Sequence, residues 1–512
     1  TLDPHSFPTR RSSDLRVEGI WISESTQRPD SSQVVKMAID SQQAKGSSEW
    51  SDTALTPTMR PSSARQPDVE KTVDSDDPLT SPPPPAPSHN NGQPNGGLWA
   101  WLQVAAGFCI FFNTWGVLNT FGIFQTYYET GVLFNESSSN ISWIGSIQSY
   151  CVMVVGLISG PVYDRGYLRA LLLSGSFMIV FGFMMLSICR NFWEVLLAQG
   201  FCIGIGAGLL FVPSLAILPT YFSTKIGLAM GLAASGSSLG GVIYPIVFYK
   251  LIDQIGFGWS VRVIGFIALS TLHLPVCFMR MRVKPVKPRA ILDWSAFTDW
   301  PLVYFTLSTM IGFIGLYTML FYISYFAAAA NITTAEMSFY VVPILNAASI
   351  FGRTIPNAIS DKTGPLNCKM NITIFEDPRL LTNMLIVFGP AGIICGVLTF
   401  CVLSVKSLGG IVPIAILYGF FSGVFIALPG VCFVKLTADK SKIGTRIGMG
   451  FATFGFGVLA GGPGGGSVIG SNAIDLHWQH LWIYGGCTMM ASGVLLFAQR
   501  FWLSKGKVFI KI

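Results

Sequence analysis

The stretch that decides the fold runs from Tyr221 to Pro245 and reads YFSTKIGLAMGLAASGSSLGGVIYP. After Lys225 it contains no charged residue, and an apolar run of about 20 residues is long enough to cross a bilayer as a helix. The stretch is also rich in small residues, which let two membrane helices approach to backbone distance. The stretch predicts a central helix packed between neighbours, whose small residues either fill a tight bundle or form a sliding surface. They recur every fourth position on two faces: Gly227, Gly231 and Ser235, and Ala229, Ala233, Ser237 and Gly241.

The whole chain has the composition of a multi-span membrane protein. Only 12% of its 512 residues are charged, whereas soluble proteins average about 25%. From Leu98 onward, apolar segments of about twenty residues alternate with short polar turns. We therefore predict an all-α membrane protein with about twelve transmembrane helices in two six-helix bundles. The predicted spans are 98–121, 141–163, 168–189, 193–216, 226–250, 259–279, 301–325, 335–359, 382–405, 408–430, 443–467 and 479–503.

The remaining residues define tails and a linker. Residues 16–95 are rich in Ser, Pro and Asp and are expected to form a disordered cytoplasmic tail. The N-terminal bundle (98–279) and the C-terminal bundle (301–503) flank a cytoplasmic linker (280–300), and residues 504–512 form a second cytoplasmic tail. Residues 1–15 are excluded from functional interpretation, because the segment RSSDL at 11–15 is what a sequencing adapter encodes.

Basic residues predict the orientation of the spans. The loops on one side hold only Arg190, Lys250 and Lys406. The opposite loops hold Arg165, Arg169, Lys225, Arg280, Arg282, Lys284, Lys287, Arg289, Lys362, Arg379, Lys435, Lys440, Lys442 and Arg446. Loops rich in Lys and Arg face the cytoplasm, so both termini are predicted to be cytoplasmic. The other side carries all three predicted glycosylation sites, which favours the plasma membrane: Asn135, Asn140 and Asn331.

The two halves of the chain repeat each other. The segments 160–169 (GPVYDRGYLR) and 353–365 (RTIPNAISDKTGP) each end an apolar helix with an acid–base pair followed by glycine. Lys225-Ile-Gly-Leu is likewise echoed by Arg446-Ile-Gly-Met. Two six-helix halves in parallel repeat are typical of transporters with a substrate site near the bilayer midplane.

Compared with the matching part of the first half, the second half contains roughly twenty additional residues between Asp361 and Arg446. The candidate for this insertion is 368–383, CKMNITIFEDPRLLTN, which is polar between two apolar stretches. It is either a retained intron, since Cys-Lys can be encoded by a splice-donor sequence, or a natural cytoplasmic insert.

After Pro94 the chain resembles the major facilitator superfamily, and within it the fungal branch of the monocarboxylate-transporter-like family. Residues 95–101 (NGGLWAW) resemble the start of that family's first span, with Asn95 in place of the usual aspartate. Residues 221–241 resemble its fifth-span signature, and residues 160–169 resemble the superfamily loop between spans two and three. The resemblance implies alternating access, in which two bundles rock around a central site.

The resemblance also implies a latch at the cytoplasmic side. Asp164 with Arg165 and Arg169 is expected to hold that side closed, together with Asp361 in the repeat and Lys225 at the fifth span. The alternative is that these charges only anchor the helix ends at the membrane surface.

Substrate binding is assigned through the same resemblance. Animal relatives couple a proton to a carboxylate through a first-span Lys and an Asp–Arg pair in span eight. Here Arg353 matches the Arg, but Ser349 and Asn119 occupy the Asp and Lys positions. Arg353 either binds an anionic group or reaches the membrane interface. Interhelical hydrogen bonding is the alternative for the other candidate contacts: Asn113, Asn119, Tyr317, Tyr322 and Asn346.

We predict a secondary active or facilitative transporter of a small organic solute, monocarboxylate-like or a secondary metabolite, moved with or without a proton. The missing coupling charges favour efflux or facilitated exchange of a larger, less polar compound, and uptake is the alternative direction. The alternative is a non-transporting sensor on the same fold. The sequence has no CxxC spacing, no clustered catalytic or metal-binding residues and no ATP-binding loop. We therefore expect no enzyme activity, metal, cofactor or nucleic-acid partner; the partners are the solute and the bilayer, and a monomer is compatible with the sequence.

Overall fold

The structure, a computed structural model, describes residues 95–282, 288–363, 378–437, 439, 442–470 and 476–503. Residues 1–94, residues 504–512 and positions 368–377 of the predicted insertion lie outside this part. Every regular element of the described part is helical, as the apolar segments predicted, because a chain in lipid must satisfy its backbone hydrogen bonds internally. The predicted boundaries of the tails, linker and bundles stay predictions.

The first half contains seven α-helices and one π-helical segment within the fourth span. In chain order they are α1 (Leu98–Asn113), α2 (Trp115–Tyr128), α3 (Ser138–Asp164), α4 (Leu168–Leu186), α5 (Phe192–Val195), η1 (Leu196–Ile203), α6 (Gly204–Tyr221) and α7 (Ile226–Phe278). The second half follows a 3-10 turn, η2 (Trp294–Thr298). It comprises α8 (Trp300–Ala329), α9 (Ala335–Thr363), α10 (Pro378–Cys401), η5 (Val402–Ser404), α11 (Leu408–Ala427), α12 (Pro429–Leu436), α13 (Ile443–Ile469) and α14 (Trp478–Leu503).

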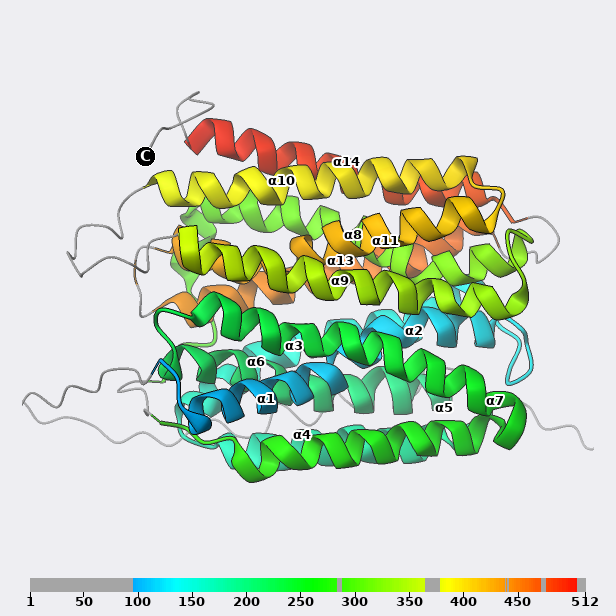
Figure 1. Cartoon of the computed structure of the whole chain (residues 1–512), viewed down its shortest axis with the longest axis horizontal. Coiled ribbons are helices and arrows are strands. Elements are labelled where there is room, and N and C mark those ends of the chain that lie inside the picture. Colours follow the sequence, from blue (N-terminus) through cyan, green and yellow to red (C-terminus); the bar gives the residue numbers. More distant parts are fainter. Residues whose placement is uncertain are drawn as a thin grey trace, which may run out of the picture. The chain divides into compact units, whose positions relative to one another are not determined.

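Nine helical segments of the described part are long and apolar enough to cross a membrane. One of them, α7, has 53 residues and bends at Gly256, whose φ of 74° and ψ of 171° are not helical. The amide of Asn113 contacts Tyr244 and Thr271, one from each arm of α7, so both arms pack against the end of α1. In Figure 1 the chain turns back at this bend, and α1 lies between the two arms. Divided at Gly256, these nine segments lie at the positions of ten predicted spans, and α9 and α10 lie at the positions of the other two.

The two halves meet along α3 with α13 and along α7 with α9, and α2 also contacts α8 and α9 (Figure 1). A Cβ on Gly236 or Gly240 would overlap the backbone of α1, and a Cβ on Gly241 would overlap the Asn346 side chain of α9. A Cβ on Gly231 would lie 3.1 Å from the Arg353 carbonyl oxygen of α9. The prediction of a central helix packed between neighbours is therefore confirmed. Gly231 and Gly241, which were placed on different predicted faces, both lie against α9.

The segment at Asn95 and the turn at Tyr221 form one unit. The Asn95 side-chain oxygen accepts hydrogen bonds from the Ser223 amide at 2.6 Å, the Ser223 hydroxyl at 2.8 Å and the Thr224 amide at 3.0 Å. Its backbone amide donates to the Tyr221 carbonyl at 3.1 Å. An amide oxygen therefore supplies the acceptor that an aspartate would supply, and the substitution noted in the sequence leaves this connection intact.

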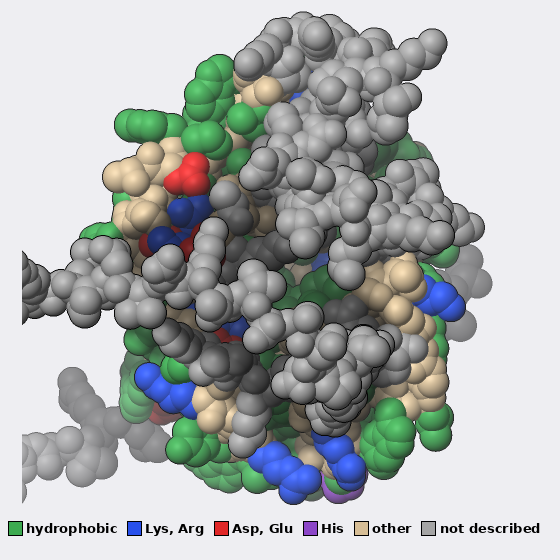
Figure 2. Space-filling view, turned by 90° about the vertical axis from the view of Figure 1, so that its left-hand side faces the viewer, with side chains coloured by type: hydrophobic (Ala, Val, Ile, Leu, Met, Phe, Trp, Pro, Cys, Tyr) green, Lys and Arg blue, Asp and Glu red, His purple; other side chains and the backbone are tan. Residues whose placement is uncertain are grey.

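The two ends of the helices differ in charge. Asn135, Asn140 and Asn331 are exposed at one end, which we call the predicted external end. Arg165, Arg169 and Lys225 are exposed at the other, the predicted cytoplasmic end. Figure 2 shows several groups of Lys and Arg side chains on this second end, one of them beside acidic side chains.

Candidate functional site

Polar side chains from both halves meet near the middle of the helices around Arg353 of α9. The Arg353 Nε donates to the Ser349 hydroxyl at 3.1 Å, and one terminal nitrogen donates to the Ser237 hydroxyl of α7. The Asn119 amide of α2 donates to the Ser237 carbonyl oxygen at 3.4 Å. Tyr317 of α8 interacts electrostatically with Arg353. We call these five residues the Arg353 cluster.

The Arg353 side chain is only 3% exposed. A guanidinium that reached the membrane interface would be open to solvent, so the interpretation as an interfacial arginine does not fit. In the part of the chain that the structure describes, no carboxylate contacts it; its partners are hydroxyl groups. Removing a charge from water without a counter-ion is costly, and such a site attracts an anion.

The structure brings together three of the six predicted substrate contacts, namely Arg353, Asn119 and Tyr317. Asn346 packs on Gly241 two helical turns from Arg353 and donates to the Val342 carbonyl oxygen at 3.0 Å.

The two other predicted contacts lie outside the Arg353 cluster. Asn113 ties α1 to both arms of α7, at 2.6 Å from the Tyr244 hydroxyl and 2.8 Å from the Thr271 hydroxyl. Tyr322 donates to the Gly462 carbonyl oxygen of α13 at 2.9 Å. Both therefore make the interhelical hydrogen bonds that were the alternative to substrate contact.

The sequence interpretation missed further polar residues near this level. Ser237 was seen only as a small residue, and Ser149 of α3, which lies beside the Tyr317 hydroxyl, was not singled out. The neighbouring Gln148 is fully buried, and neither polar atom of its amide has a partner in the structure. A buried glutamine in an apolar span was the signal that could have identified α3 as a wall of the site.

The predicted cytoplasmic end is closed by the linker between the two halves. Arg289 binds Asp164, the last residue of α3, through its backbone amide at 3.0 Å and through two guanidinium nitrogens. A Cβ on Gly444, at the start of α13, would overlap the same guanidinium. Arg289 therefore lies between the end of α3 and the start of α13, with its charge held bidentately.

A second group of charges fixes the linker to α13. Arg446 donates to Asp293 at 3.0 Å and to Asp299 at 2.7 Å, and Lys442 lies 3.3 Å from Asp293. The Thr445 hydroxyl donates to the Ala290 carbonyl oxygen at 2.7 Å. We call residues 288–299 the linker strap, since they contact both halves at this end.

The predicted latch residues differ in burial and in ion pairing. Asp164 is buried and ion-paired, but its partner is Arg289 rather than Arg165 or Arg169, both of which are exposed. Lys225 is exposed at the start of α7. The side chain of Asp361 lies outside the described residues.

The predicted external end is closed by contacts between α2 and α8 and between α3 and α13. The Phe121 and Phe321 rings lie 4.7 Å apart, and the Ser139 hydroxyl donates to the Pro463 carbonyl oxygen at 3.0 Å. The Arg353 cluster therefore lies between two closed ends.

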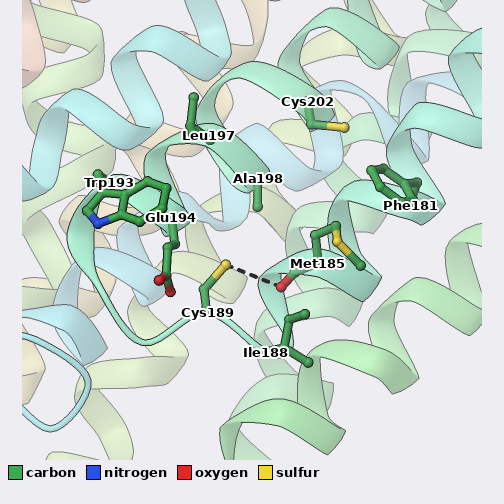
Figure 3. Close-up of a pocket in the computed structure, with 9 residues that line it drawn as sticks. All are labelled: Phe181, Met185, Ile188, Cys189, Trp193, Glu194, Leu197, Ala198 and Cys202. Carbon is green, nitrogen blue, oxygen red and sulfur yellow. Dashed lines mark hydrogen bonds between the residues drawn. The ribbon is translucent and has the colours of Figure 1, made fainter.

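Figure 3 shows a pocket of about 400 Å³ between α4 and the α5–η1 segment. Its rim includes the exposed side chains of Phe181, Trp193 and Leu197, and the Cys189 thiol donates to the Met185 carbonyl oxygen at 3.2 Å. All its residues come from the first half, and exposed apolar side chains on a spanning helix face lipid. This pocket is therefore separate from the Arg353 cluster.

Known proteins with similar sequences identify the family of this chain. Residues 104–428 match the Major Facilitator Superfamily. The chain is 56% identical over 417 residues to the MFS-type transporter dbaD of Emericella nidulans, an alignment covering 81% of this chain and 89% of that protein.

Two further relatives are named for what they export. The Aspyridones efflux protein apdF of Emericella nidulans is 34% identical over 82% of this chain and 81% of its own length. The Agnestins efflux protein AgnL12 of Paecilomyces divaricatus is 31% identical over 80% of this chain and 88% of its own length. The chain therefore belongs to the Major Facilitator Superfamily and is a membrane transporter, not an enzyme.

Proposed function

We propose that the protein exports a small, largely apolar organic anion, of the secondary-metabolite class, across the plasma membrane by alternating access. The observation that carries this proposal is the buried guanidinium of Arg353, which contacts hydroxyl groups and no described carboxylate. A carboxylate or acidic phenol on the solute would supply the missing negative charge.

The surroundings favour a solute larger and less polar than lactate. The aromatic rings of Tyr317, Phe313 and Phe321 follow one another along α8, with Tyr317 and Phe321 centroids 5.4 Å apart. Such rings provide contact area for an aromatic or aliphatic body. The names of two relatives as efflux proteins support the outward direction.

Alternating access is supported by the position of the Arg353 cluster. The linker strap closes the predicted cytoplasmic end, and the α3–α13 contact closes the predicted external end. Opening either end alone would expose the cluster to one side. Relatives named as transporters favour this function over the non-transporting sensor that the sequence left open.

The test is deletion of the chain in its host, followed by mass spectrometry of compounds inside and outside the cells. We expect one acidic metabolite to accumulate inside, and wild-type protein to restore its release. Arg353→Gln should fail to restore release, whereas Arg262→Gln should succeed, because Arg262 lies over Trp259 and bonds Ser187 away from the cluster. Unchanged metabolite distribution, or full release by Arg353→Gln, would overturn the proposal.

A further inference from the structure

A carboxylate at the predicted external end is held by uncharged donors. Glu129 follows the last residue of α2 and is half-buried. One of its oxygens accepts from the Gln125 amide nitrogen at 2.7 Å, and the other accepts from the Ser138 hydroxyl at 2.9 Å. Within the described residues no Lys or Arg pairs with it, whereas cations pair with Asp164, Asp293, Asp299 and Glu336.

Ser138, which donates to Glu129, lies beside the contact between α3 and α13. Ser138 begins α3, and its carbonyl oxygen accepts from the Gln125 amide at 3.3 Å. The next residue, Ser139, donates to the Pro463 carbonyl oxygen of α13. A Cβ on Gly466 would overlap the Ser139 backbone, so α13 touches this turn directly. A change in the bonds of Glu129 therefore reaches the α3–α13 contact within one residue.

The surroundings of Glu129 allow it to change charge near neutral pH. Burial raises the pKa of Glu129 to about 7, although the hydrogen bonds from Ser138 and Gln125 lower it. From α8, Tyr322 and Tyr325 interact electrostatically with it. The facing stretch of α13, residues 462–466, reads GPGGG and has no titratable side chain.

Other charged groups at this end have partners of their own. Glu136, in the loop before α3, accepts from the exposed Asn140. Lys250, on α7, pairs with Glu336 at the start of α9. Lys250 is therefore paired with another acid, and Glu136, which is an acid itself, cannot act as a counter-ion to Glu129.

We infer that Glu129 is the proton-binding site of the transport cycle, taking a proton from the predicted external side and using it to release the α3–α13 contact. The inference rests on the proposed function, in which an anion leaves as protons enter. It also supplies the acid that the Arg353 cluster lacks, since Ser349 occupies the position of the aspartate.

The proton transfer has a defined direction. A hydronium ion gives its proton to the Glu129 carboxylate and leaves water. The Gln125 amide nitrogen can only donate, so the proton goes to the oxygen facing Ser138. The new O–H then donates to the Ser138 hydroxyl oxygen, whose own hydrogen must turn to another acceptor. In this step the hydrogen bond between Glu129 and the first turn of α3 reverses its direction, and the Ser138 hydroxyl hydrogen leaves the carboxylate.

Two measurements on the purified full chain in lipid nanodiscs test the inference without a solute. Infrared difference spectra over pH 5 to 9 report protonation of carboxyl groups, in wild type, Glu129→Gln and the matched control Glu336→Gln. Spin labels at the exposed positions Val132 and Ser467, introduced as Val132→Cys and Ser467→Cys after replacement of accessible cysteines, report the distance between the halves.

We expect a carboxyl signal with a midpoint near pH 7 in wild type and Glu336→Gln that is absent from Glu129→Gln. The label distance should change with the same midpoint and lose its pH dependence in Glu129→Gln. Glu129→Asp should keep a titration with a shifted midpoint if the Gln variant folds poorly. A distance that ignores pH, or that responds equally in Glu129→Gln, would overturn the inference. Failed export with an intact titration would overturn only the proposed function.

Discussion

Hydroxyl and amide groups surround the Arg353 guanidinium, and none of them supplies the negative charge that would neutralise it. Ser349 lies one helical turn away and already bonds its guanidinium. Ser349→Asp would place a carboxylate against Arg353 and exclude an anionic solute from it. We expect this variant to fold and to lose export of the acidic metabolite by about tenfold or more. Ser349→Asn, which is polar but uncharged, should export far better. Equal export by the two variants in whole-cell release assays would contradict the assignment.

Asp164 and Arg289 form a largely buried pair, with side chains 4% and 17% exposed. Removing one partner leaves the other charge uncompensated, at a cost of about 3 kcal/mol. We expect Asp164→Asn and Arg289→Gln each to lower stability by this order, and the double variant to lose much less than their sum. Thermal unfolding of the purified variants measures the coupling. Strictly additive losses would show that the pair does not hold the end closed.

The ion-pair partner of Asp164 could not be identified from the sequence. The sequence identified Asp164 from its position at a helix end, and assigned it the nearest arginines. Its partner Arg289 lies 125 residues away. Glu129 was overlooked for a related reason, because nothing in the local pattern shows that Gln125 and Ser138 enclose it.

At the scale of elements, the close contact between α7 and α9 depends on Gly241. A Cβ at this position would lie 2.6 Å from the Asn346 side chain. We expect Gly241→Ala to lower the thermal unfolding temperature and the export rate, because overpacking costs about 1–3 kcal/mol. Asn346→Ala in the same chain should restore both. The control is Gly430→Ala, since a Cβ at Gly430 meets nothing within 4 Å. Failure of the second substitution to rescue would contradict the contact.

The linker strap is expected to be insensitive to pH near neutrality. Burial tends to raise the pKa of Asp293, but hydrogen bonds from Ser295, Arg446 and Lys442 hold it well below its usual range. A depressed carboxylate pKa gives stability that is present above the unfolded value of about 3.9 and lost only at strongly acidic pH. Hydrogen exchange in residues 290–299 should therefore stay protected from pH 5 to 9, and Asp293→Asn should lose protection. A loss of protection in wild type between pH 5 and 9 would contradict this.

The elements were predicted from the sequence more completely than the site. Predicted spans 141–163 and 443–467 correspond to α3 and α13 within a few residues, because lipid requires continuous apolar helices. The turn at Gly256 also falls between two predicted spans. The π-helical segment η1 and the strap were missed, because they depend on packing partners rather than on hydropathy.

At the scale of the whole molecule, the Arg353 cluster is separated from both ends by contacts of different kinds. Ion pairs of the strap close one end, and aromatic and backbone contacts close the other. In the proposed function these ends open in turn, and the inferred proton on Glu129 acts on one of them.

The most direct test of the central claim is transport by the purified protein in lipid vesicles loaded with the acidic metabolite that deletion of the chain retains. Release should be rapid for the acid, slow for its methyl ester, and absent with Arg353→Gln. Release of acid and ester at equal rates, or undiminished release by Arg353→Gln, would contradict the assignment of Arg353 as the anion-binding group.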